Sequence, residues 1–361
     1  MTVRTIVVGC GAVAQRLYRK PLAQLAKQKM IEVVGLVDPA REHADEMLPS
    51  FAGARHFASL EEACKAARPE LTLVLTPPHL HCAQTEMAFA HGSHVLCEKP
   101  MANSSAECLR MLESSRAANR VLAIGMIRRY FPAFARLREW VRSGALGQLQ
   151  SFEYREGHKF EWAVTTPAAF RPRAKGGAGV LFDIGTHALD FLESVFGELT
   201  VQEYADDTAG GVATNVAMRL AAADCTGSLK LSWDVPLLNE LRVVGSTAEA
   251  VLRIDRFDQL AVGRRGAFVP QPIDVSFPVD LERGAGKRIV PLSYSDAVLC
   301  QLVQVLRAIK LDEPPAVDGQ GGASCIRLIE NALSKASPLP EPWLTPREQA
   351  VAAQLHGSVA R

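Results

Sequence analysis

The sequence predicts an α/β protein with an N-terminal, doubly wound parallel sheet and a second α+β domain with a large, mostly antiparallel, open-faced sheet. Three observations support this class. Short β-branched runs alternate with helical patterns over the first 125 residues, longer alternating strands follow, and 361 residues suit two domains better than one. We expect domains at residues 1–125 and 126–336, with 337–361 as a tail on the surface.

The first domain is predicted from strands that are apolar on both faces and from helices between them. Two S-x-x-E capping boxes, at Ser59 and Ser104, mark helix starts. The expected strands are Thr5–Val8, Ile31–Val37, Leu71–Leu75, Val95–Cys97 and Val121–Ile124. The expected helices are Ala12–Gln28, Arg41–Met47, Ser59–Ala67, His81–His91 and Ser104–Ala118.

Alternating apolar and polar residues predict the sheet of the second domain. Its expected strands are Leu149–Tyr154, Val212–Leu220, Cys225–Trp233, Leu241–Val244, Ala250–Ile254, Gln259–Val262 and Ile273–Phe277. Helices are expected at Arg136–Arg142, Asp296–Lys310 and Gly322–Ala336, and a surface loop from Ser337 before a short end helix. We expect one sheet face to be apolar and not covered by helices, and therefore to form a homodimer or homotetramer.

Composition excludes several classes of protein. A formal net charge of +1 argues against nucleic acid or an anionic membrane as the main partner. No apolar run reaches the roughly 18 to 20 residues that a membrane helix needs. The single Arg4 and the interruption by Gly9 and Gly11 argue against a signal peptide. Eight cysteines without a C-x-x-C pair indicate reduced core thiols, so we expect a cytoplasmic protein.

A glycine-rich turn follows the first predicted strand. Gly9 to Ala14 form G-x-G-x-x-A, in which Gly9 permits a tight turn and Gly11 lets a pyrophosphate approach the backbone. The helix that begins here directs N–H groups and its positive dipole end at the phosphates. We therefore expect a dinucleotide to bind here.

Asp38 ends the second predicted strand, where a carboxylate accepts the ribose hydroxyls of adenosine. Its charge repels a 2′-phosphate, so NAD is favoured, although Arg41 softens this preference and NADP stays possible. The alternative interpretation of Asp38 is a turn residue before Pro39.

Three further side chains point to chemistry. Lys99 follows the fourth predicted strand, in Glu98-Lys99-Pro100, and ligands bind at the carboxyl ends of such strands. Asp183 and His187 are four residues apart in a predicted helix and share one face, so the carboxylate could fix the tautomer of the imidazole. The alternatives are a surface lysine and a histidine satisfied within the core.

The sequence resembles the glucose–fructose oxidoreductase, inositol dehydrogenase and rhizopine-catabolism (Gfo/Idh/MocA) family over about residues 3 to 336. The resemblance rests on the glycine turn, Thr76-Pro77-Pro78 with His81, Glu98-Lys99-Pro100, and Asp183 with His187. Gly176-Gly177-Ala178-Gly179 departs from the family's usual three glycines. Phe170 stands where many members carry a tryptophan beside the cofactor.

The resemblance implies a nicotinamide-dependent oxidoreductase acting on CH–OH groups of a sugar, sugar derivative or cyclitol. It makes Lys99, Asp183 and His187 the catalytic residues. His187 would take the hydroxyl proton, Lys99 would stabilise the alkoxide or relay the proton, and Asp183 would orient His187 or bind a substrate hydroxyl. The expected cofactor-binding residues are Gly9, Gly11, Ala12, Val13, Asp38, Thr76, Pro77, His81, Glu98, Lys99 and Arg171.

The second domain supplies the expected substrate residues. Polar and flat apolar groups suit a polyol, and they are Arg129, Tyr154, His158 and Trp162, together with Glu156. Arg129 could equally be a surface ion-pair partner. Two histidine pairs, His79 with His81 and His91 with His94, would suggest zinc, but no ligand set is complete, so we expect no metal.

Four functions remain open at this point. They are a dehydrogenase that exchanges NAD, an enzyme that keeps NAD bound for epimerisation, elimination or dismutation, a non-catalytic dinucleotide-binding regulator, and a reductase of an imine or unsaturated ring. Retention of Lys99, Asp183 and His187 together speaks against the regulator. The reductase would not require the pair Asp183 and His187.

Overall fold

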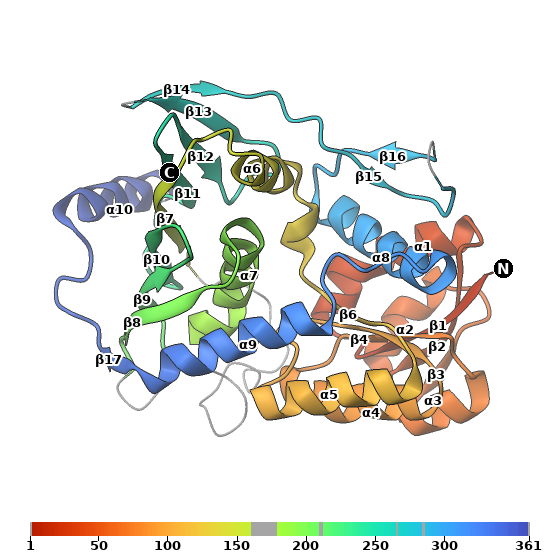
Figure 1. Cartoon of the computed structure of the whole chain (residues 1–361). Helices are drawn as coiled ribbons and strands as arrows, with labels where there is room; N and C mark the ends of the chain where they lie inside the picture. Colours follow the sequence, from red (N-terminus) through yellow and green to blue (C-terminus); the bar gives the residue numbers. More distant parts are fainter. Residues whose placement is uncertain (1, 160–178, 209–211, 265, 284–285, 360–361) are drawn as a thin grey trace. The chain divides into compact units, whose positions relative to one another are not determined.

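The computed structural model describes residues 2–159, 179–208, 212–264, 266–283 and 286–359, with side chains up to residue 355 (Figure 1). Contacts divide the chain into two compact units. The first holds the residues up to Tyr130 and Ser276–Ile326, and the second begins at Phe131 and includes the C-terminal residues from Arg327. The expected second segment, 126–336, is thus shared between the two units.

The first unit is built on a six-stranded parallel sheet, as predicted. Its strand order is β3-β2-β1-β4-β5-β6, and every neighbouring pair is parallel. This order is the one that doubly wound dinucleotide-binding sheets adopt. The prediction missed the short β3. The strands are β1 (Val3–Val8), β2 (Ile31–Val37), β3 (Arg55–Phe57), β4 (Leu71–Val74), β5 (His94–Cys97) and β6 (Leu122–Ile124).

The helices of this unit match the predicted spacing, with one exception. Ser59 and Ser104 each accept a hydrogen bond from the N–H three residues on, as the capping boxes predict. The helices are α2 (Arg41–Met47), η2 (Leu48–Ser50), α3 (Leu60–Ala67), η3 (Pro78–Leu80), α4 (His81–Ala90), α5 (Ser105–Ala118), η4 (Ile127–Tyr130) and α8 (Tyr294–Leu311).

The exception is the helix expected over Ala12–Gln28, which is not one regular α-helix. Its beginning contains a π-helical turn, η1 (Ala14–Tyr18), in which the N–H of Arg19 bonds to the carbonyl of Ala14, and α1 (Arg19–Lys27) follows. A π-turn holds one residue more than an α-turn and changes the direction of the side chains after it. Helix α8 packs against both η1 and α1, which explains why the later segment belongs to this unit.

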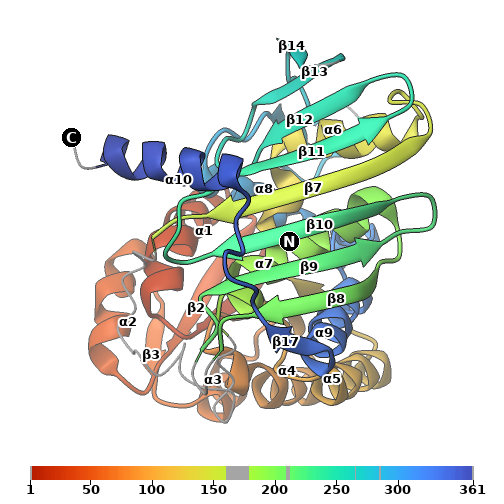
Figure 2. The same ribbon diagram turned by 90° about the vertical axis from the view of Figure 1, so that its left-hand side faces the viewer.

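The second unit is built on a nine-stranded mixed sheet, seen side by side in Figure 2, in the order β14-β13-β12-β11-β7-β10-β9-β8-β17. Most pairs are antiparallel, as predicted, but β7 with β10 and β8 with β17 are parallel. The strands are β7 (Leu149–Gly157), β8 (Thr200–Asp206), β9 (Asn215–Ala221), β10 (Thr226–Ser232), β11 (Glu240–Gly245), β12 (Glu249–Arg253), β13 (Leu260–Arg264), β14 (Ala267–Pro270) and β17 (Ala336–Pro338).

Helices of the second unit include α6 (Pro132–Arg142), α7 (Gly179–Phe196) and α10 (Pro346–Val359), and α9 (Gly319–Ser334) runs across the division at Ile326. Helix α7 packs on the sheet face from which Leu229 and Leu231 of β10 project. The proximity of Gly185 in α7 to the Leu231 side chain shows which face this is. Residue 230, between these two leucines, projects from the opposite face.

Two predictions for this unit were wrong. Ile273–Phe277 is not a strand of the large sheet: only Phe277–Pro278 (β15) pairs, with Arg288–Ile289 (β16), in a separate two-stranded ribbon within the first unit. Pro272, directly before this segment, lacks the N–H that a ladder requires. The tail from Ser337 does not begin as a loop, because Ala336–Pro338 forms β17 at the sheet edge, and β8 and β14 were also missed.

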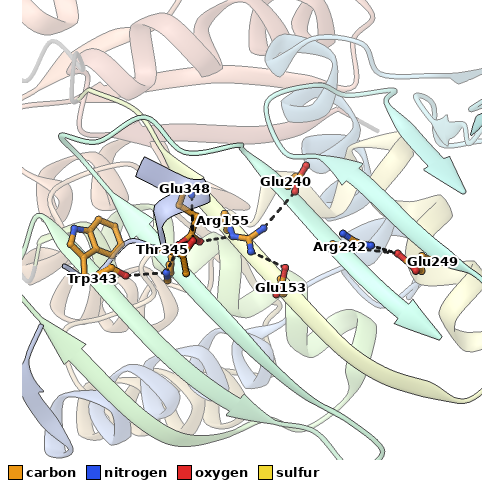
Figure 3. Close-up of polar contacts among 9 residues, drawn as sticks. Glu153, Arg155, Glu240, Arg242, Glu249, Trp343, Thr345 and Glu348 are labelled. Carbon is orange, nitrogen blue, oxygen red and sulfur yellow. Dashed lines mark hydrogen bonds and ion pairs between the residues drawn. The ribbon is translucent and has the colours of Figure 1, made fainter. Parts of the chain in front are cut away.

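The outer face of the sheet carries ion-paired side chains beside half-buried apolar ones such as Val251, so it is not the apolar face that we expected. Figure 3 shows Arg155 of β7 between Glu153, Glu240 and Glu348, and Arg242 of β11 paired with Glu249. Acidic and basic side chains at neighbouring positions pair with one another across the strands. These ion pairs weaken the argument from an apolar face, and the homodimer or homotetramer stays a prediction.

The start of α10 covers part of this same face. Glu348 in its first turn contacts Arg155 and Lys230, and Thr345 and Trp343 lie beside it (Figure 3).

All eight cysteines are buried and none forms a disulfide, as predicted. Within the described residues, no helix combines the length and apolar character needed to cross a membrane.

Candidate active site

The glycine turn after β1 has the geometry expected for binding a pyrophosphate. Gly9 has φ +87°, and a Cβ there would lie 2.9 Å from the carbonyl carbon and oxygen of Leu75, so only glycine fits. A Cβ on Gly11, in contrast, would meet nothing within 4 Å. The space beside Gly11 is thus open, and Ala12 and Val13 next to it are half-buried. The residues present fit a dinucleotide phosphate at a helix N-terminus.

Asp38 belongs to the same turn through its hydrogen bonds. One carboxylate oxygen accepts the N–H of Cys10 at 2.8 Å, and the other accepts the N–H of Ala40 at 2.9 Å and lies 3.3 Å from His43 Nδ1. The side chain is 10% exposed. A carboxylate has about four lone-pair positions, so ribose hydroxyls could still bind to it. Asp38 therefore combines the two interpretations open from the sequence: it holds the turn, and it retains acceptor capacity.

The thiol of Cys10 lies inside this turn. Burial raises its pKa to about 12, and the negative charge of Asp38 adds to this effect. Cys10 is therefore a protonated thiol at neutral pH and adds no negative charge beside a phosphate.

Glu98 and Lys99 follow β5 at the carboxyl edge of the parallel sheet, where ligands bind in such folds. Lys99 is half-buried. Glu98 is buried, and its two carboxylate oxygens accept hydrogen bonds from the Tyr18 hydroxyl at 2.5 Å and from the Lys99 N–H at 3.0 Å. Burial raises the pKa of Glu98, while the hydrogen bond from Tyr18 and the charge of Lys99 lower it.

His81 links two of the predicted cofactor segments. Its ring nitrogens lie 2.7 Å from the carbonyl oxygen of Thr76 and 2.9 Å from that of Pro100. The imidazole is fully buried, and burial lowers its pKa. His81 thus ties the loop after β4 to the turn after Lys99, and direct contact with a cofactor stays a prediction. Thr76 and Pro77 are half-buried on the same loop.

Helix α7 of the second unit carries Asp183 and His187, as predicted. Both are half-buried, whereas the residues between them are fully buried. The two side chains therefore share the less buried face of the helix. Gly179 starts the helix with φ +63°, and a Cβ there would clash with the carbonyl oxygen of Ala213. The same carbonyl accepts the N–H of Val180 at 3.0 Å, which fixes the helix start beside β9.

The predicted substrate residues have different environments. His158 is exposed after β7, and Arg129 is half-buried in η4. Tyr154 is fully buried, and its hydroxyl donates to Glu156 at 2.7 Å, so it packs in the core of the second unit rather than on its surface. Trp162 and Arg171 lie outside the described residues, as does Phe170. Within the described ranges, no group of three or more potential metal ligands occurs.

Tyr18 and Gln301 are two buried residues near Glu98 that were not predicted from the sequence. Tyr18 is fully buried, and its oxygen accepts a hydrogen bond from Gln301 Nε2 of α8 at 3.0 Å. No local pattern marks either residue, because 283 residues separate them.

Comparison with known proteins agrees with this geometry. Residues 3–126 match the model of the oxidoreductase family with an NAD-binding Rossmann fold, and residues 134–251 match the model of the GFO/IDH/MocA C-terminal domain. The chain belongs to the Gfo/Idh/MocA family. Its N-terminal domain is thus an NAD-binding Rossmann domain, which confirms the expected cofactor class and the resemblance found in the sequence.

Relatives in the Gfo/Idh/MocA family include D-glucoside 3-dehydrogenase of Escherichia coli, 27% identical over 54% of this chain and 54% of that protein. Inositol 2-dehydrogenase of Streptomyces avermitilis is 35% identical over 32% of this chain and 34% of that protein. The matches thus span about half or less of these relatives. The crystal structure of aldose–aldose oxidoreductase from Caulobacter crescentus, complexed with glycerol, has a TM-score of 0.77 at 22% identity and covers 93% of this chain and 97% of that chain. This likeness shows the fold.

Proposed function

We propose that this protein is an NAD(P)-dependent oxidoreductase that acts on a secondary alcohol or ketone carbon of a sugar, sugar derivative or cyclitol. The observation that carries the proposal is the open approach to Gly11 together with a half-buried Lys99 at the carboxyl edge of the same sheet. The names of the D-glucoside and inositol dehydrogenases support this substrate class. Asp38 favours NAD.

In the proposed mechanism, bound NAD supplies the hydride acceptor or donor at C4 of its nicotinamide ring. The turn from Gly9 to Val13 binds the pyrophosphate. His187 accepts the proton of the substrate hydroxyl, and Lys99 stabilises the negative charge that develops on its oxygen. Asp183, one helical turn before His187, orients the imidazole or binds a neighbouring hydroxyl.

The test is the substitution Lys99→Met, assayed by NADH absorbance on polyols, aldoses and sugar nucleotides with NAD and with NADP. We expect turnover to be lost while NAD still binds, because Lys99 acts on the reacting oxygen. Lys65→Met, on the exposed side of α3, is the matched control and should keep full activity. Full activity of Lys99→Met would refute the proposal.

A further inference from the structure

A chain of buried hydrogen bonds in the first unit ends at the backbone of Lys99. Gln301 donates from Nε2 to the oxygen of Tyr18 at 3.0 Å, Tyr18 donates to Glu98 Oε1 at 2.5 Å, and Glu98 Oε2 accepts the N–H of Lys99 at 3.0 Å. Gln301 is 2% exposed and Tyr18 is 0% exposed. Burying a polar group costs free energy unless it is hydrogen-bonded. Gln301 Nε2 has such a partner in Tyr18, whereas Gln301 Oε1 has none within the described residues.

The chain has a fixed direction. Because the Tyr18 oxygen accepts the amide hydrogen of Gln301, its own hydrogen is free to point at Glu98. A hydroxyl that accepts one bond is a stronger donor in the next. Gly125 closes the other side, since a Cβ there would lie 2.9 Å from Glu98 Oε1. The carboxylate of Glu98 is thus held from several sides.

The π-turn explains how Tyr18 reaches this position. Tyr18 is its last residue, and the additional residue in the turn alters the direction of the side chain relative to a regular α-helix. A π-turn within a helix is rare, and where it occurs it is frequently at a functional site. Here the π-turn directly follows the glycine turn in the sequence, and its last residue, Tyr18, donates the hydrogen bond to Glu98.

We propose that Tyr18 and Gln301 are positioning residues for Lys99: through their hydrogen bonds they keep Glu98 an ionised acceptor that fixes the Lys99 backbone and places a negative charge beside the Lys99 ammonium. The inference rests on the proposed catalytic role of Lys99.

The pKa of Glu98 is raised by burial, and the hydrogen bond from the Tyr18 hydroxyl favours its ionised form. Within the described residues, the titratable groups that act on Glu98 are Tyr18 of η1 and the two residues on either side of Glu98, Cys97 and Lys99. Burial raises the pKa of Glu98, and the hydrogen bond from Tyr18 counters this rise. Without the hydroxyl, the pKa of Glu98 rises further, so a larger fraction of the group is neutral at pH 7 and regains its charge as the pH increases.

Tyr18→Phe removes only the hydroxyl and tests the proposal. We expect kcat to fall about tenfold at pH 7, equivalent to ~1.4 kcal/mol, with KM for NAD little changed. The ratio of mutant to native kcat should then rise towards alkaline pH. In the cofactor-free protein labelled with ¹³C-glutamate, the Glu98 carboxyl signal, identified by its absence in Glu98→Gln, should titrate at higher pH in Tyr18→Phe.

The matched control is Tyr204→Phe in the second unit. Tyr204 is also a buried tyrosine, and its hydroxyl donates to Asp206 at 2.8 Å. It should lose stability but leave the pH dependence of kcat unchanged. Gln301→Leu keeps the Tyr18 hydroxyl and removes its donor, so it should shift the same quantities in the same direction by less, and it replaces Tyr18→Phe if that variant does not fold.

A kcat ratio that is constant with pH, or an unmoved Glu98 titration, would overturn the positioning role. If Lys99→Met keeps its turnover, the proposed function fails. If Lys99→Met is inactive and Tyr18→Phe behaves as the native protein, only the positioning role fails.

Discussion

Glu348 provides a quantitative test of how α10 is held on the sheet of the second unit. Its carboxylate accepts hydrogen bonds from Arg155 Nε at 2.8 Å and Lys230 Nζ at 2.7 Å, and from the N–H and hydroxyl of Thr345 at 2.8 and 2.9 Å. Burial alone would raise the pKa of Glu348, but the hydrogen bonds from Lys230 and Thr345 and the charge of Lys230 lower it to about 2. Glu348→Gln keeps the shape and removes the charge.

The shift from 4.5 to about 2 would be worth ~3 kcal/mol at ~1.4 kcal/mol per unit. Solvent near the pair screens part of this, so we expect Glu348→Gln to cost about 1 to 2 kcal/mol at neutral pH. Because the folded pKa is depressed, this stability is present above pH ~4.5 and is lost as the pH falls towards 2. The difference between native and variant should therefore shrink over that interval.

The assay is urea unfolding from pH 7 to pH 3, combined with hydrogen exchange of the α10 amides as a local measurement. Glu61→Gln, at a fully exposed ion pair with Lys65 on α3, is the control and should change stability little. The reasoning is refuted if Glu348→Gln exchanges α10 amides at the native rate, or if its stability deficit is the same at pH 3 and pH 7.

The cofactor turn gives two further predictions. Gly11→Ala should leave the unfolding midpoint unchanged but weaken NAD binding at least about tenfold, because its Cβ would occupy the open space that the pyrophosphate needs. Gly9→Ala should also lower stability, because its Cβ would clash with Leu75. Calorimetric titration measures the NAD affinity and thermal melts measure the stability; equal NAD affinity of Gly11→Ala and the native protein would argue against this site. Asp38→Asn should reduce the preference for NAD over NADP, measured as the ratio of the two dissociation constants, while the bond to the Cys10 N–H is kept; an unchanged ratio would assign Asp38 to the turn alone.

Local patterns predicted the first unit closely because its strands are buried on both faces and its helices begin at strong caps. β2 has the predicted bounds, and Ser59 and Ser104 cap the helices as expected. A missed local signal also exists: Thr345-Pro346-Arg347-Glu348 is a capping box with proline at the first helical position, and the structure shows both of its hydrogen bonds.

Patterns of burial were less informative in the second unit. The alternation along β7 correctly indicated one buried face, but it could not show what faces the other side. That side is covered by ion pairs between strands and by the first turn of α10, whose residues lie nearly 200 positions from β7. The period-2 pattern of Ile273–Phe277 also did not reveal that only its last residue pairs, in a separate ribbon.

Local spacing and the positions of strand ends were enough to predict the parallel sheet and the glycine turn. They were also enough to select Lys99, Asp183 and His187 as candidate residues. Three facts could be read only from the folded chain. Tyr18 links Gln301 to Glu98, Tyr154 is fully buried, and the outer sheet face carries ion pairs and is partly covered by α10. These facts depend on contacts between residues far apart in the chain, and pairing energies of that kind leave no periodic signal in the sequence.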